Sequence, residues 1–198
     1  EAHNNYFEYI ENDVEKFAKS YHLDLSKRIF STNLEEILIE EFGYTIDDKE
    51  LSKHDNLSVL RNIYIPKTKT LLIDKNISEA QKTFIYAKEL AYNYLKIEDR
   101  LYTFPWVKFE KFDQVLNNFI ASYFAGALII SRKSLTEKLT NFFELEEWTP
   151  LKLHQIINHF NCSQETFYQR LTNILPKYFN IKNLFFLRFT HKENSPEF

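Results

Sequence analysis

Apolar side chains recur at spacings of three and four residues along most of this chain, and that periodicity limits what it can fold into. It places apolar side chains on one face of an α-helix. The first such stripe contains Phe7, Ile10, Val14, Phe17 and Tyr21. Further helices are predicted over residues 32–43, 78–95, 109–130, 133–143, 150–160 and 163–175.

Local start and stop signals mark two of these helices. Thr32 followed by Glu35, and Ser78 followed by Gln81, have the spacing of a capping box, which satisfies free backbone N–H groups at a helix start. Gly43 is typical of the position just beyond a helix end. These signals predict that one helix begins at Thr32 and another at Ser78.

Two segments read as strands instead. Residues 57–74 are rich in Ile, Leu, Val and Tyr and are interrupted by a Pro-Lys-Thr-Lys turn, which predicts a β-hairpin. The run LFFLRF, residues 184–189, predicts a further strand. The predicted fold class is therefore α+β, mostly helical, with a small antiparallel sheet.

Residues 150–175 have the outline of a helix-turn-helix. The second helix, SQETFYQRLTNIL, carries one Arg and one Glu, and its apolar residues are expected on the inner face. A helix that reads bases needs more exposed donors. We interpret this C-terminal subdomain as a structural or dimer-forming copy of that motif.

Composition excludes several classes of function. Gly43 and Gly126 are the two glycines of the chain, which excludes a Gly-rich phosphate loop and the dinucleotide fingerprint. A net charge of -3 argues against strong DNA binding by these residues. The single cysteine, Cys162, provides no disulfide and no Cys-rich zinc site and suits the cytoplasm. The longest apolar runs are too short for a membrane span.

The helix predicted over residues 78–95 carries an unusual charge. At 100° per residue, Lys88 lies in the middle of the apolar face, between Phe84 and Tyr92, whereas Glu89 lies on the polar flank. One interpretation is that the lysine stem packs and the ammonium reaches water. The other is that the charge faces an internal cavity and binds an anionic ligand. The sequence leaves both open.

The same helix resembles the active-site helix of the ImmA/IrrE zinc peptidases, which reads AHELGH. Here the six residues are AKELAY, residues 87–92, so Lys88 and Tyr92 stand where that family has metal-binding histidines, and Glu89 stands at the general-base position. The family's next element, roughly E-x-E-A-N-x-F-A, resembles NFIASYFA, with Asn118 and Ile120 at the acidic positions. Since ammonium is a poor zinc ligand, the resemblance implies a pseudo-peptidase without metal, cofactor or catalytic residues.

Three further stretches resemble regulators that join an XRE-type helix-turn-helix to an ImmA/IrrE-like domain, the short-chain fatty acyl transcriptional regulators. They are SYFAGALIISRKSL (122–135), HFNCSQETFYQRLTNI (159–174) and FFLRF (185–189). Because the sequence begins at Glu1 and contains no Met, we expect it to be part of a longer protein. The resemblance implies a cytoplasmic homodimer that binds DNA only through an N-terminal domain outside this chain.

The resemblance also suggests a ligand, a small acyl or acyl-CoA-type effector. We expect its anionic or carbonyl group near Lys88, with Tyr92 and Glu89 beside it, and its tail near Tyr123. Two arginines in strand-like runs, Arg61 and Arg188, could bind its phosphates, although both could equally be solvated strand residues. Tyr123 could equally be a core tyrosine.

Three segments follow from this assignment. Residues 1–56 are predicted N-terminal helices for linking or dimerisation, residues 57–132 the ImmA/IrrE-like domain, and residues 133–198 a C-terminal helical subdomain with a final strand. Two other functions stay open: a protein-interaction domain without a small ligand, and an active peptidase that binds zinc and is inactivated by Glu89→Gln.

Overall fold

The computed structural model describes residues 5–54, 57, 60–100 and 111–187. Within them the helices are α1 (Glu8–Ser20), α2 (Ser31–Glu40), α3 (Glu79–Tyr94), α4 (Phe112–Ile129), α5 (Arg132–Phe143), α6 (Pro150–His159) and α7 (Gln164–Tyr178), with a short 3-10 turn at Leu51–Lys53. The strands are β1 (Thr45–Asp47), β2 (Asn62–Ile65) and β3 (Thr70–Ile73). The predicted mostly helical α+β class is confirmed.

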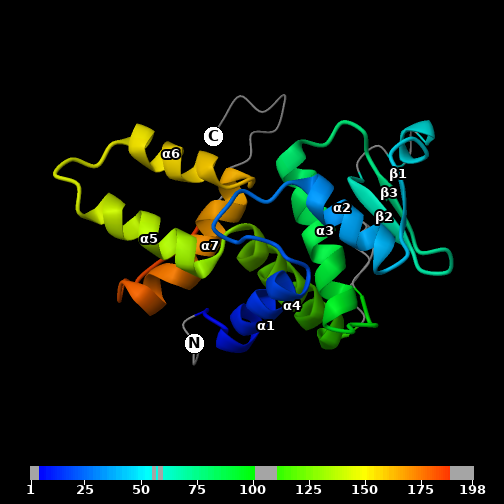
Figure 1. Cartoon of the computed structure of the whole chain (residues 1–198), viewed down its shortest axis with the longest axis horizontal. Helices are drawn as coiled ribbons and strands as arrows, with labels where there is room; N and C mark the ends of the chain where they lie inside the picture. The colour runs from blue at the N-terminus through cyan, green and yellow to red at the C-terminus, as the bar shows by residue number, and fades with distance from the viewer. Residues whose placement is uncertain (1–4, 55–56, 58–59, 101–110, 188–198) are drawn as a thin grey trace.

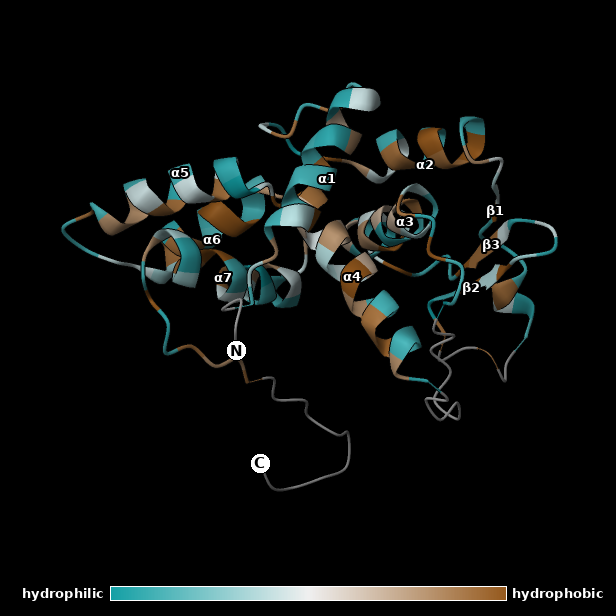
Figure 2. Ribbon diagram, turned by 90° about the horizontal axis from the view of Figure 1, so that it is seen from below, coloured by the Kyte–Doolittle hydropathy of each residue, from teal (hydrophilic) through white to brown (hydrophobic). Residues whose placement is uncertain are grey.

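The elements form two ends joined by a helical centre (Figure 1). The three C-terminal helices α5, α6 and α7 lie together at one end, and the sheet lies at the other. Between them α3 packs against both α2 and α4, and α1 packs against α4. Figure 2 shows α4 coloured as apolar over much of its length, whereas α1 is largely hydrophilic on its visible side.

The sheet combines the predicted hairpin with a strand that was not predicted. β2 and β3 pair antiparallel, with Asn62 opposite Ile73. β1 pairs parallel with β3, with Thr45 beside Thr70, so the sheet is mixed rather than purely antiparallel. The strand order β1-β3-β2 leaves β2 at an edge.

The start of α3 confirms its predicted capping box. The backbone N–H of Gln81 donates to Ser78 Oγ at 3.3 Å, and the backbone N–H of Ser78 donates to Gln81 Oε1 at 2.9 Å. Farther along, Ala87 and Ala91 are fully buried, and their small side chains let neighbouring helices approach closely. This local sequence therefore fixes both the start and the inner face of the helix.

The predicted capping box of α2 is wrong. The helix begins at Ser31, and the Asn33 side chain accepts the backbone N–H of Phe30 at 3.3 Å. Ser31 also donates from its backbone N and its hydroxyl to the carboxylate of Glu79, at 2.8 and 2.9 Å. A contact with the first turn of α3 therefore holds this helix start, in place of a purely local signal.

The predicted C-terminal strand is also wrong over the residues that can be checked. Residues 181–187 have no regular secondary structure, and Phe185 is 84% exposed. A strand needs a hydrogen-bonding partner, and the described sheet has none for this segment. Arg188 and Phe189 lie outside the described residues.

One hydrophobic cluster extends through the centre of the molecule. It includes Leu38, Phe124 and Phe167, one from each of the three segments expected from the sequence. No single helix in the described ranges is both long enough and apolar enough to cross a membrane; α4 and α5 together pass that test, but they are bent by 61° at their junction.

Candidate functional site

A pocket of about 340 Å³ opens between the edge strand β2, α3 and the first turns of α7. Phe84, Lys88 and Tyr92 line it from α3, because residues four apart share one helix face. No residue of α4 is among the described residues that line it. Two hydrogen bonds join α3 to α4 beside the pocket.

Those hydrogen bonds join the three positions that the ImmA/IrrE resemblance assigns to metal ligands and an acidic residue. Lys88 Nζ donates to Asn118 Oδ1 at 2.7 Å, and the Tyr92 hydroxyl approaches the same oxygen at 3.4 Å. The ammonium also lies 5.9 Å from the centre of the Tyr92 ring. The resemblance therefore brought together residues that do meet in space.

Lys88 has more hydrogen-bonding capacity than its partners use. An ammonium has three N–H donors, and the amide oxygen of Asn118 accepts one of them. Burial lowers the pKa of Lys88, and the negative charge of Glu89 partly opposes that shift. In the part of the chain that the structure describes, no carboxylate forms an ion pair with it. Lys88 lines the pocket, and its ammonium has donor capacity beyond the hydrogen bond to Asn118.

Glu89, in contrast, is buried and held through one of its carboxylate oxygens. Helical spacing predicts it on the polar flank of its helix, but only 6% of it is exposed. Arg100 Nη1 forms an ion pair with Glu89 Oε2 at 2.6 Å, and the Tyr44 hydroxyl donates to the same oxygen at 3.0 Å. Burial raises the pKa of Glu89, although Arg100 and Tyr44 oppose the shift. The carboxylate at the general-base position is thus held by a cation.

The Arg100 guanidinium lies against two tyrosine rings. Its carbon is 4.3 Å from the centre of the Tyr64 ring and 4.7 Å from that of Tyr92. Tyr64 in turn stacks on Tyr44 at 5.1 Å. Sequence reasoning missed Arg100, Tyr44 and Tyr64, which come from a loop, the turn between α2 and β1, and a strand. No local signal pointed to them, because the helical spacing had placed Glu89 on the polar flank.

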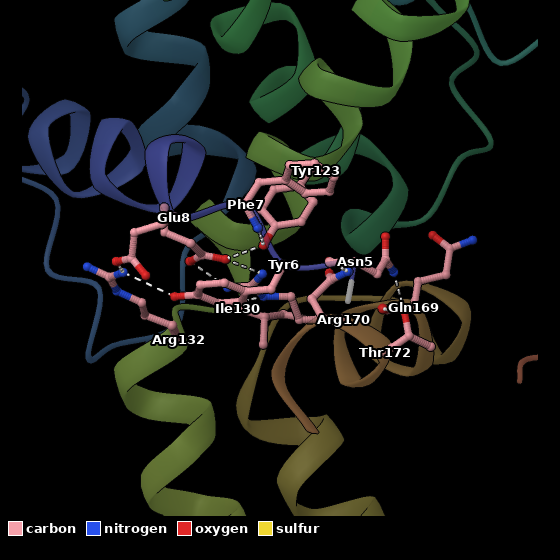
Figure 3. A network of polar contacts seen from close by, with 12 residues as sticks. Asn5, Tyr6, Phe7, Glu8, Tyr123, Ile130, Arg132, Gln169, Arg170 and Thr172 are labelled. Atoms are coloured by element: carbon pink, nitrogen blue, oxygen red, sulfur yellow. Dashed lines mark hydrogen bonds and ion pairs between the residues drawn. The ribbon is translucent and has the colours of Figure 1, made fainter. Parts of the chain in front are cut away.

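Tyr123 belongs to a different network (Figure 3). Its hydroxyl donates to Glu11 Oε1 at 2.8 Å and accepts the backbone N–H of Phe7 at 3.2 Å. Arg170 binds both carboxylate oxygens of Glu11, at 2.6 and 2.8 Å, and donates from Nε to the carbonyl of Ile130 at 3.0 Å. These contacts join α1, α4 and α7.

A second group of contacts, made by Arg132, holds α1 to the start of α5. Arg132 donates to the side chains of Glu8, Asn12 and Glu15, and also to the Tyr6 hydroxyl at 3.1 Å. Figure 3 shows the Arg132 guanidinium pointing toward Tyr6 and Glu8. Together the two arginines tie the first helix of the chain to its C-terminal half.

The structure places the expected ligand-binding residues in two groups. Arg61, Lys88, Glu89 and Tyr92 line the pocket described above, with the exposed Arg61 at its edge. Tyr123 instead lines a neighbouring pocket of about 250 Å³. Arg188 is not among the described residues. In the described ranges no three His, Cys, Asp or Glu side chains are grouped closely enough to hold a metal ion.

Comparison with known proteins places this arrangement in a family. The IrrE N-terminal-like domain family matches residues 28–172. The chain belongs to that family. No curated protein gives a significant sequence match.

Among solved structures, a Mycobacterium tuberculosis transcriptional regulator is similar to the chain with a TM-score of 0.60 and 19% sequence identity. The match covers 86% of this chain and 48% of that one, so the chain spans about half the length of the regulator. This likeness shows that the two share a fold.

Proposed function

We propose that this IrrE-like chain is the ligand-sensing part of a bacterial transcriptional regulator and that it has no peptidase activity. Its effector is a small acyl or acyl-CoA-type molecule that binds in the pocket over Lys88. The observation that carries the proposal is Lys88, which stands where the resemblance places a metal ligand, lines the pocket and has ammonium donors beyond the one that Asn118 accepts.

The donor set at this position does not suit zinc. Zinc is bound by thiolate, imidazole or carboxylate, whereas Lys88, Tyr92 and Asn118 offer an ammonium, a phenol and an amide oxygen. The nearby carboxylate of Glu89 is engaged by Arg100. A cation occupying the metal position also repels a second cation. These residues support binding of an anion or a carbonyl group in place of metal-assisted hydrolysis.

The pocket suits a ligand with one charged and one apolar part. Its volume of about 340 Å³ falls in the ordinary range for small-molecule sites. Lys88 and Arg61 provide positive charge, and charge-assisted hydrogen bonds are the strong ones. Phe84 and Ile85 provide apolar surface in the same pocket. An acyl thioester of coenzyme A has both parts, with its phosphates extending beyond Arg61.

The proposal includes the role of the chain in a regulator. DNA binding belongs to an N-terminal helix-turn-helix domain outside this sequence, because the net charge of -3 does not suit phosphate contacts. A regulator that reads a two-fold operator is normally a symmetric dimer. We therefore expect a cytoplasmic homodimer. Light scattering should give about twice 23.9 kDa, and a monomer at high concentration would contradict the dimer.

The test is binding of acyl-CoA esters to the purified chain, followed by calorimetry and thermal melting. A ligand of the folded state raises Tm by mass action. Lys88→Ala should weaken binding by about 1.5–3 kcal/mol, which is the loss of one charge-assisted contact. The matched control is Lys133→Ala, because Lys133 is an exposed lysine on α5 that lines neither pocket. If no ester binds, a protein-interaction domain becomes the better explanation; stoichiometric zinc in the protein would contradict the pseudo-peptidase.

A further inference from the structure

Gly126 is a buried glycine in the interior of α4, and packing does not explain it. Glycine inside a helix is less favourable than alanine. Such a residue usually allows another backbone to approach closely. Here a Cβ added at Gly126 would meet no neighbouring heavy atom within 4 Å among the described residues. The space beside this glycine is therefore empty although the residue is buried.

That space is the neighbouring pocket of about 250 Å³ between α4 and α7. Phe84, Phe119 and Tyr123 give it aromatic walls. Two of the polar side chains on its α7 side, Arg170 and Asn173, are already engaged. Arg170 is bonded to Glu11 and to a backbone carbonyl, and Asn173 donates to the carbonyl of Asn5 at 2.8 Å. The interior therefore offers mostly apolar surface.

This apolar compartment adjoins the pocket over Lys88. Phe84, Thr166 and Gln169 line both spaces. Phe84 lies one helical turn before Lys88 on the same face of α3, and its aromatic side chain lines both spaces.

We infer that the compartment beside Gly126 receives the straight apolar tail of a ligand whose carbonyl or anionic head lies at Lys88, and that Gly126 sets the longest tail that fits. The inference rests on the proposed function and extends it to the choice among ligands. A tail enters past Phe84, and the missing side chain at Gly126 leaves room for its end. A larger residue at position 126 would fill part of the compartment, and the head group of the ligand could still bind at Lys88.

The experiment measures the affinity of straight-chain acyl-CoA esters, from acetyl to decanoyl, by calorimetry. In the wild-type chain each added methylene that enters the compartment should raise affinity about fourfold, until the compartment is full. In Gly126→Leu the affinity should stop rising at a tail roughly three carbons shorter than in the wild-type chain. Gly126→Ala is the matched control, since a Cβ fits there and alanine favours the helix.

Two further variants keep the outcome clear. Ser122→Leu lies one turn earlier on α4 and lines the same compartment, so it should also shorten the preferred tail if Gly126→Leu fails to fold. Lys88→Ala should weaken all esters by one common factor and leave the dependence on length unchanged. Two outcomes would overturn the inference but leave the proposed function standing. In the first, binding depends on Lys88 but not on tail length; in the second, neither leucine variant changes the preferred tail length. If no ester binds at all, the proposed function fails and the inference fails with it.

Discussion

Two buried glutamate–arginine pairs in this protein are built from the same kinds of residues but sit in different surroundings. In each pair a tyrosine hydroxyl donates to the carboxylate, Tyr44 to Glu89 and Tyr123 to Glu11. In each pair a guanidinium also lies over a tyrosine ring. The pairs differ in how completely their hydrogen-bonding groups are used.

The Glu11–Arg170 pair is closed. Both side chains are 2% exposed, both carboxylate oxygens are bound, and Nε of Arg170 reaches a carbonyl. The Glu89–Arg100 pair is more open: its side chains are 8% and 12% exposed, and Arg100 binds a single oxygen at the edge of the pocket. The first pair holds helices together, whereas the second belongs to a surface that a ligand can reach.

The largest effect is expected when the closed pair is broken. Arg170→Met leaves the Glu11 charge buried without a cation, which should lower the free energy of unfolding by about 3–5 kcal/mol. Urea denaturation followed by circular dichroism measures it. The double change Glu11→Met with Arg170→Met should recover most of the loss, because no unpaired charge remains. A loss below about 1 kcal/mol in the single variant would contradict this account, because the Glu11–Arg170 pair would then behave as an exposed pair does.

A smaller and pH-dependent effect is expected for Arg100→Met. Glu89 can take up a proton, and its pKa is already raised by burial; losing the cation should raise it further. Below the usual value of 4.5 the carboxyl is protonated in both the folded and the unfolded chain, so the loss of stability is smallest there. As the pH rises above 4.5 the unfolded chain ionises first, and the loss should grow to about 1–3 kcal/mol at neutral pH. A loss independent of pH between 4 and 7 would contradict this account of the pair.

The smallest effect, of opposite sign, is expected for Lys88→Met. Lys88 is a partly buried cation that forms no ion pair with a carboxylate of the described residues, and burial lowers its pKa. The variant should therefore gain roughly 0.5–2 kcal/mol of stability at neutral pH, as is common when functional strain is removed.

The pH dependence of this gain follows from the direction of the shift. Above the usual lysine pKa of 10.5 the amine is neutral in both the folded and the unfolded chain, so the advantage of the variant should shrink as the pH approaches 10.5. Thermal melts at neutral pH and near pH 10 measure it. A destabilised Lys88→Met variant would show that Lys88 stabilises the fold, as the two arginines do.

The parts of this fold that local sequence determines were predictable. The capping box at Ser78 and Gln81 is an exchange between neighbours in the chain, and it forms as expected. The start of α2 was mispredicted because Glu79, far away in sequence, bonds Ser31. β1 was missed because its three residues are held by parallel pairing with β3, which no local pattern reveals.

The candidate site shows the same division. The spacing on α3 and the family resemblance pointed to Lys88 and Tyr92, and these meet Asn118 in space. The position of the pocket was missed because one wall comes from the start of α7, about 80 residues later. Arg100 was missed because its role depends on a fold that places a loop over the α3 helix.

The closed pair also has a consequence for the order in which the chain can fold. Arg170 follows Glu11 by 159 residues, so a ribosome adding about 5–20 residues per second delivers it roughly 8–30 seconds later. Until then Glu11 has no buried cation and stays in water. Packing of α1 against α4 should therefore be weaker until α7 has been synthesised, and translation arrested before Arg170 should leave α1 more open to proteases. Because of this pair, α1 should pack stably against α4 late in folding, after the ribosome has synthesised α7.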